Sequence, residues 1–167
     1  MYRLFIVDDN KYERHGLRKS IDWEALGIEV VGVFENGAEA MARIDELAPH
    51  IIITDIAMPV MNGIEMSERI AKQYPEIKVI FISCHSDFEF AKSAVDLGIH
   101  GYVLKPVIAD ELVDAVKKLV QELEVGHLQR VERERMLQQV KTMLPLVQEQ
   151  FFKELLLGNF RDDADIR

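Results

Sequence analysis

Short apolar runs alternate with amphipathic stretches along the first two thirds of the chain. The apolar runs are residues 4–7, 28–34, 51–54, 79–82 and 102–104. The run at 51–54 has no polar alternation, which is typical of a central parallel strand buried on both faces. Between the runs, apolar residues recur at helical spacing over residues 10–20, 37–47, 64–74 and 87–97. The pattern predicts five strands separated by helices.

This alternation predicts an α/β protein. Because crossovers between parallel strands are right-handed, the units favour a flavodoxin-like (βα)5 doubly wound parallel sheet with strand order 2-1-3-4-5. In that order the switch point lies between the first and third strands, and the ligand crevice lies beyond the carboxyl ends of the strands. Functional side chains are therefore expected directly after the strands.

Polar side chains follow four of the predicted strands. Asp8 and Asp9 come after the first strand, Asp55 after the third, Ser83 after the fourth and Lys105 after the fifth. In a parallel sheet these side chains converge on one crevice. Asp55 taken alone could instead cap the following turn. Its convergence with two further acids and an ammonium group favours a site.

The three converging acids predict a bound cation. Close carboxylates repel one another and resist ionising together unless a cation joins them. Oxygen ligands without a nearby cluster of Cys or His suit magnesium better than zinc, and magnesium commonly binds through carboxylates and phosphate oxygens. Lys105 would supply a positive charge to a phosphoryl group. The pattern thus indicates phosphoryl chemistry with magnesium as cofactor.

These motifs, taken in order, resemble the receiver domain of response regulators. The resemblance covers residues 1–123 and rests on the acidic pair, the DIAMPVMNG stretch that starts at Asp55, the strand-end Ser83 and the KP dipeptide at Lys105. It implies a phosphorylation-dependent switch of a two-component system, which takes a phosphoryl group from a sensor histidine kinase. Such a switch is not an enzyme beyond accepting the group and slowly losing it again.

The resemblance implies roles for the acids and for the loop beside them. Asp55 would be the phosphoacceptor. Asp9 would bind magnesium directly, and Asp8 would act mainly through water. The backbone carbonyl of Ala57 would complete the protein ligands, together with Asp55. The Ala57 side chain would help to set the lifetime of the phosphoryl group.

The resemblance also implies roles at the ends of the last two strands. Lys105 would pair with the phosphoryl oxygens, and Ser83 would donate its hydroxyl to them. The peptide bond between Lys105 and Pro106 would be cis. Tyr102 would act with Ser83 as a switch, as the aromatic side chain that rotates when the hydroxyl moves. His85, two residues after Ser83, would tune the lifetime of the phosphoryl group.

Two other functional classes share features of this pattern. An aspartate nucleophile with magnesium and lysine also describes haloacid-dehalogenase phosphatases, but these need a second acid two residues after the nucleophile, where this chain has Ala57. A receiver that keeps the fold but serves only as an interaction module is the second alternative. A phosphoryl-donor assay with magnesium separates the three classes, because only the switch forms a slowly decaying acyl phosphate.

The composition limits the partners and the cellular location that we expect for this chain. The chain has 167 residues and a formal net charge of −9, which argues against nucleic-acid binding by this stretch, since that needs a basic face. Neither a signal peptide nor a membrane span is expected, so we expect a cytoplasmic protein without a membrane partner. Cys84 is the only cysteine, which excludes a disulfide within the chain; we expect it to be partly buried.

The C-terminal part carries a helical repeat beyond the predicted receiver. Apolar residues share two heptad phases, one with Val116, Leu123, Leu137, Leu144 and Phe151, the other with Leu112, Leu119, Val140 and Val147. Gly126, Arg130 and Arg133 weaken the middle, and Pro145 is expected to kink or restart the helix. Residues 124–167 therefore form either a helical linker that pairs with its copy in a homodimer or an extended linker.

The end of the chain resembles the start of a further region. The SDFEFAKSAVDLGIHGYVLKPV stretch and the LLLG after the long helix resemble YesN-type regulators, in which the receiver is joined to an AraC-type helix-turn-helix domain. The resemblance implies control of transcription, with DNA bound only through a C-terminal domain that is missing from this chain.

Overall fold

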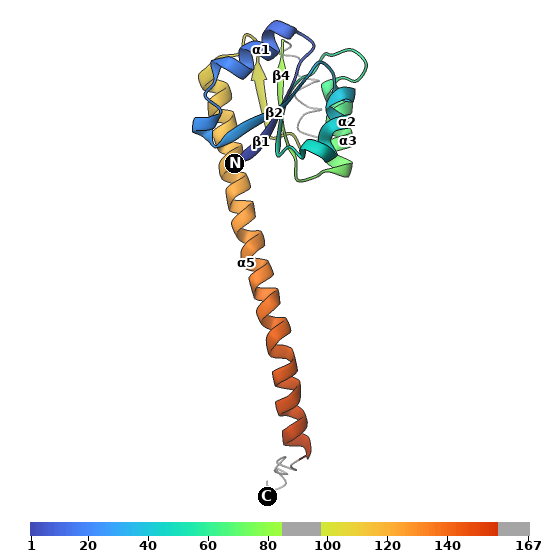
Figure 1. The fold of residues 1–167 in the computed structure, drawn as a ribbon, viewed down its shortest axis with the longest axis vertical. Coiled ribbons are helices and arrows are strands. Elements are labelled where there is room, and N and C mark those ends of the chain that lie inside the picture. Colours follow the sequence, from blue (N-terminus) through green and yellow to red (C-terminus); the bar gives the residue numbers. More distant parts are fainter. Residues whose placement is uncertain (85–97, 157–167) are drawn as a thin grey trace, which may run out of the picture. The chain divides into compact units, whose positions relative to one another are not determined.

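The core of the molecule is a parallel five-stranded sheet in the order β2-β1-β3-β4-β5 (Figure 1). The computed structural model describes residues 1–84 and 98–156. Its strands are β1 (Tyr2–Val7), β2 (Ile28–Phe34), β3 (Ile51–Asp55), β4 (Lys78–Ser83) and β5 (Gly101–Leu104). The predicted flavodoxin-like topology is confirmed, including the switch point between β1 and β3, where the order of the strands reverses.

Helices cover both faces of the sheet. They are α1 (Lys11–Ser20), the 3-10 turn η1 (Glu24–Leu26), α2 (Gly37–Leu47), α3 (Gly63–Gln73) and α5 (Ala109–Leu156). In the first of two compact units, Met1–Gln121, α1 and the beginning of α5 lie on one face, and α2 and α3 lie on the other (Figure 1). The helix predicted over residues 87–97 lies outside the described residues.

Asparagine side chains begin three of these helices. Asn10, Asn36 and Asn62 precede α1, α2 and α3, and the side-chain oxygen of each accepts a backbone N–H from the first turn. At α3 the cap is reciprocal, because the Glu65 carboxylate accepts from the Asn62 N–H. These caps satisfy N–H groups that have no partner within the helix. They also fix where the helices begin after the carboxyl ends of β1, β2 and β3.

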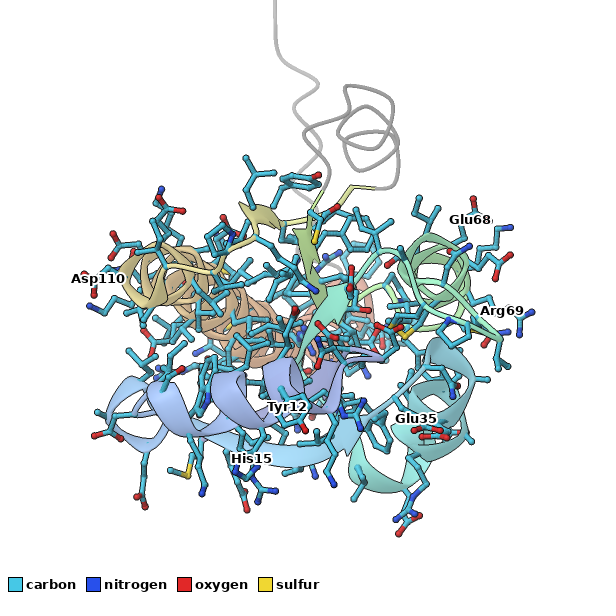
Figure 2. The ribbon with its side chains drawn as sticks, turned by 90° about the horizontal axis from the view of Figure 1, so that it is seen from above. Tyr12, His15, Glu35, Glu68, Arg69 and Asp110 are labelled. Carbon is cyan, nitrogen blue, oxygen red and sulfur yellow. The ribbon has the colours of Figure 1, made fainter. Side chains whose placement is uncertain are left out.

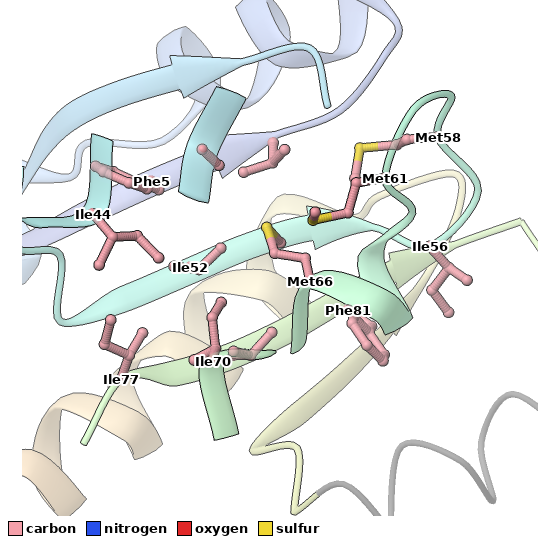
Figure 3. Packing of buried hydrophobic residues seen from close by; sticks show 13 residues of the cluster. Phe5, Ile44, Ile52, Ile56, Met58, Met61, Met66, Ile70, Ile77 and Phe81 are labelled. Carbon is pink, nitrogen blue, oxygen red and sulfur yellow. The ribbon is translucent and has the colours of Figure 1, made fainter. Parts of the chain in front are cut away.

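The central strands are buried from end to end. All five residues of β3 and the last four of β1 are buried, as the run of apolar residues in each strand predicts. On the side of α2 and α3, aliphatic, methionine and phenylalanine side chains form one cluster (Figure 3). Members of the cluster include Phe5, Ile44, Ile52, Met66, Ile70 and Phe81. The cluster holds the strand ends in fixed register, which a site built across several strands requires.

The second compact unit is Glu122–Arg167, and its described part, as far as Leu156, is the continuation of α5. The helix runs through Pro145, so the predicted restart there is wrong. Proline removes one backbone hydrogen bond, and the good helix formers around it sustain the helix on both sides. In the described part of the chain, α5 included, no helix has a stretch apolar enough to cross a membrane.

Candidate functional site

The polar side chains predicted at the strand ends meet at one edge of the sheet. Val7 pairs with Thr54, so Asp8 follows β1 beside the Asp55 that ends β3. Ser83 ends β4 opposite Leu104, and the Lys105 N–H donates to the Ser83 carbonyl at 2.9 Å. The parallel register is therefore what gathers residues from four separate stretches of the chain.

Three carboxylates stand close enough to share one cation. Asp8, Asp9 and Asp55 each offer an oxygen within 4.8 Å of the others. Asp8 and Asp55 are buried, at 1% and 8% exposed, whereas Asp9 is exposed. A hollow of about 410 Å³ lies beside them and is lined by Asp9, Ile56, Ala57, Met58, Pro59, Asn62 and Ile64. This set of oxygen donors, open on one side, fits magnesium, which keeps some of its waters.

Lys105 sits inside the acidic cluster. Its Nζ lies 2.8 Å from Asp55 Oδ2 and 3.1 Å from Asp8 Oδ2, and it also forms an ion pair with Glu13 Oε2. Burial alone would lower the pKa of Lys105, but the hydrogen bonds that its ammonium donates to Asp55, Glu13 and Asp8 raise that pKa above its ordinary value. The ammonium group is therefore charged at any physiological pH.

Asp8 is the acid of the cluster whose ionised form is disfavoured by its surroundings. Burial raises the pKa of its carboxyl from 3.8 to about 6, against the opposing effects of the Asn10 N–H and of Lys105, and the charge of Asp55 raises it further. The Asn10 N–H donates to Asp8 Oδ1 at 2.8 Å. Without a cation, the protein thus holds a carboxylate whose charge is poorly compensated.

Backbone groups hold Asp55 and the loop that follows it. The Ala57 N–H donates to Asp55 Oδ1 at 3.3 Å, and the Gly63 N–H donates to the Ile56 carbonyl at 2.9 Å. Gly63 packs directly on the end of β3, where a Cβ would overlap the Asp55 carbonyl oxygen. The start of α3 therefore presses on the strand end that carries Asp55.

The remaining predicted residues lie around the same strand ends. Ser83 is buried, at 2% exposed, and the peptide bond between Lys105 and Pro106 is cis. Tyr102 is half-buried, pairs with Phe81 across β4 and β5, and packs against the apolar cluster. His85 lies outside the described residues. Cys84, expected to be partly buried, is exposed, because it follows the end of β4.

Two residues of α1 reach the site and were not predicted. Glu13 contacts Lys105, and Arg14 Nη1 donates to the backbone carbonyls of Asp8 at 2.5 Å and Asp9 at 3.0 Å. Tyr12 and His15 lie on the outer side of the same helix (Figure 2). Only the position of Glu13 and Arg14 in the sequence could have indicated this role. A helix that begins directly after the acidic pair places some side chains of its first turn over that pair.

A comparison with known protein families matches residues 4–117 to the response regulator receiver domain. The chain belongs to this family. Its receiver domain is similar to the solved receiver domain of AraT, a response regulator from Geobacillus stearothermophilus. That similarity has a TM-score of 0.71 and 30% identity over 75% of this chain and 98% of the other.

The receiver is also similar to named regulators of transcription. The "Uncharacterized transcriptional regulatory protein YesN" of Bacillus subtilis is 28% identical over 95% of this chain and 43% of its own length. The transcriptional regulatory protein DegU of Brevibacillus brevis is 34% identical over 71% of this chain and 50% of its own length. The chain thus spans about half the length of these relatives.

Proposed function

We propose that this receiver is a phosphorylation-dependent switch that accepts a phosphoryl group on Asp55 from a sensor histidine kinase, with magnesium as cofactor. One observation carries the proposal: Asp55 ends the central strand, 2.8 Å from the Lys105 ammonium, inside a group of three carboxylates. A nucleophilic oxygen, a fixed cation and a set of oxygen donors are the parts that phosphoryl transfer to a carboxylate requires.

The chain's own residues account for the transfer. A carboxylate oxygen of Asp55 attacks the donor phosphorus, and the bond from phosphorus to the donor nitrogen breaks, with its electron pair leaving on the imidazole. An acyl phosphate remains on Asp55. Lys105 pairs with the phosphoryl oxygens, and the Ser83 hydroxyl donates to one of them. Magnesium held by Asp8, Asp9, Asp55 and the Ala57 carbonyl would neutralise charge on the transferring group.

Labelling by acetyl phosphate tests this proposal. We expect the parent to take up one phosphoryl group in the presence of magnesium and to lose it slowly. Asp55→Asn should take up none, whereas Asp114→Asn, an exposed acid on α5, should match the parent. A parent that takes no label would be an interaction module, and continuous release of phosphate would indicate a phosphatase.

The output of the switch is inferred from its relatives. YesN and DegU are named as transcriptional regulators, and this chain spans 43% and 50% of their lengths. The net charge of −9 argues against DNA binding by this stretch itself, since DNA binding needs a basic face. We therefore infer control of a DNA-binding region outside this chain, of the AraC type by resemblance.

A homodimer formed through α5 completes the proposed function. In the second unit the helix exposes a series of large apolar side chains. They include Met136, Leu137, Val140, Met143, Leu144 and Phe151, each at least half exposed. Leu112, Val116 and Leu119, in the same two heptad phases, are buried in the first unit. A second copy of the helix offers the same stripe and would cover the exposed residues.

A further inference from the structure

The Lys105 ammonium group is paired with three carboxylates, those of Asp8, Glu13 and Asp55. An ammonium has three N–H donors, and Lys105 meets Asp8, Asp55 and Glu13. The Lys105 side chain is only 9% exposed, so the protein rather than water provides the acceptors for its N–H groups. No donor is then left for an oxygen of an incoming phosphoryl group unless one of the three carboxylates withdraws.

The three carboxylates differ in what the proposed reaction requires of them. Asp55 becomes the acyl phosphate and loses its carboxylate charge, and Asp8 would face the cation. Glu13 has no part in either step, and its carboxylate would stay beside Lys105 as a negative charge facing the phosphoryl oxygens. The Glu13 carboxylate and the phosphoryl oxygens would then share the charge of one ammonium group, and they would repel each other.

Glu13 is placed so that it can hold Lys105 and also leave it. It lies in the first turn of α1, where the Asn10 side-chain amide lies 3.4 Å from its Oε1, and its side chain is 38% exposed. A hollow of about 290 Å³ between α1 and the segment after β5 is lined by Glu13, Leu17, Lys105, Pro106 and Val107, among others. The side chain has room to swing away from Lys105.

We propose that Glu13 is a positioning residue that occupies Lys105 in the resting receiver and competes with the phosphoryl group for it. The inference rests on the proposed phosphorylation of Asp55. It assigns to α1 a restraint on the switch: the ion pair between Glu13 and Lys105 opposes phosphoryl uptake, because the Glu13 carboxylate draws on the ammonium charge and repels the phosphoryl oxygens. Removing the charge at position 13 should therefore favour the phosphorylated state.

The test compares Glu13→Gln with the parent in two assays at saturating magnesium. One assay measures the affinity for beryllofluoride, a mimic of the phosphoryl group, and the other measures the initial rate of labelling by acetyl phosphate. We expect both to rise roughly three- to tenfold, the range for loss of one competing charged hydrogen bond. Glu13→Ala should give the same direction, which separates loss of charge from any new contact made by Gln.

Glu46→Gln is the matched control, because it makes the same change in net charge on α2, where Glu46 pairs with Arg43. It should leave both quantities at the parent values. If it raises them as much as Glu13→Gln, overall charge is the cause and the inference is wrong. A Glu13→Gln variant equal to or slower than the parent also overturns it. The proposed function stands in both cases while the parent labels and Asp55→Asn does not, and it fails if the parent takes no label.

Discussion

At the scale of single residues, the buried charge of the acidic site destabilises the metal-free protein. Asp8 is 1% exposed, and its pKa is raised to about 6 by burial, in spite of the Lys105 hydrogen bond. Because the folded state binds this proton more tightly than the unfolded chain, the free energy of unfolding falls as the pH rises from the unfolded pKa of 3.8 towards 6. Above about pH 6 the ionised Asp8 destabilises the folded state to the full extent, and a bound cation would offset this loss.

Asp8→Asn should therefore stabilise the metal-free protein. At about pH 7.5 we expect the free energy of unfolding to rise by roughly 1–3 kcal/mol, and the gain should shrink as the pH is lowered to about 5. Denaturant unfolding at the two pH values measures this. Magnesium at millimolar concentration should raise the Tm of the parent through ligand linkage and raise that of the variant much less.

The exposed Asp114 provides the comparison for this prediction. Asp114→Asn should change neither the stability nor the response to magnesium by more than about 0.5 kcal/mol. A parent whose Tm is indifferent to magnesium would argue against a shared cation site at Asp8, Asp9 and Asp55.

At the scale of elements, α3 and β3 meet through a glycine. A Cβ at Gly63 would overlap the Asp55 carbonyl oxygen and lie 3.1 Å from the Ile56 Cα. Both neighbours are backbone, so neither can move aside as a flexible side chain would. The cap at Asn62 fixes the helix start one residue before this contact. The close approach sets the position of Asp55 as much as it sets that of the helix.

Gly63→Ala should consequently weaken both the fold and the site. We expect a loss of about 1–3 kcal/mol in the free energy of unfolding, the usual cost of overpacking, and slower labelling of Asp55 by acetyl phosphate. Gly16→Ala on α1 is the matched control, because nothing lies within 4 Å of the added Cβ. That variant should gain up to about 1 kcal/mol from helix propensity. Equal effects of the two variants would contradict the proposed contact.

At the scale of the whole molecule, α5 belongs to both compact units. Its first turns bury Leu112, Val116 and Leu119 within the unit Met1–Gln121. Beyond Gln121 the same heptad phases continue with exposed residues, such as Leu137 and Leu144 at 54% and 57%. A phosphoryl group on Asp55 can act at a distance only by favouring one of two states, and association of this helix is the state we propose it favours.

Leu137→Arg should weaken the proposed dimer. A charge placed in the apolar stripe should lower the association constant about tenfold or more, measured by sedimentation with beryllofluoride and magnesium. Gln138→Arg adds the same charge at the neighbouring exposed position and should dimerise like the parent. If Leu137→Arg also dimerises like the parent, the stripe is not the interface, although Asp55 could still be the phosphoacceptor.

Much of the molecule was determined by the sequence alone. The apolar runs predicted the five strands, and the residues directly after them predicted which side chains would share a crevice. This works because side chains at the carboxyl ends of parallel strands must share one edge of the sheet, whatever the details of packing. The helical spacing of apolar residues predicted a helix over residues 37–47, which are the bounds of α2.

The tertiary structure decided what depends on distance between side chains of different elements. Glu13 reaches Lys105, 92 positions later in the chain, only because α1 packs beside the segment after β5. The raised pKa of Asp8 likewise follows from burial, which no local pattern specifies. α5 continues through Pro145 because the stability of the whole helix outweighs the one hydrogen bond that proline removes. The positions of the strands and of the residues that follow them are set by local pattern, whereas contacts, burial and charge balance arise only when the elements have packed.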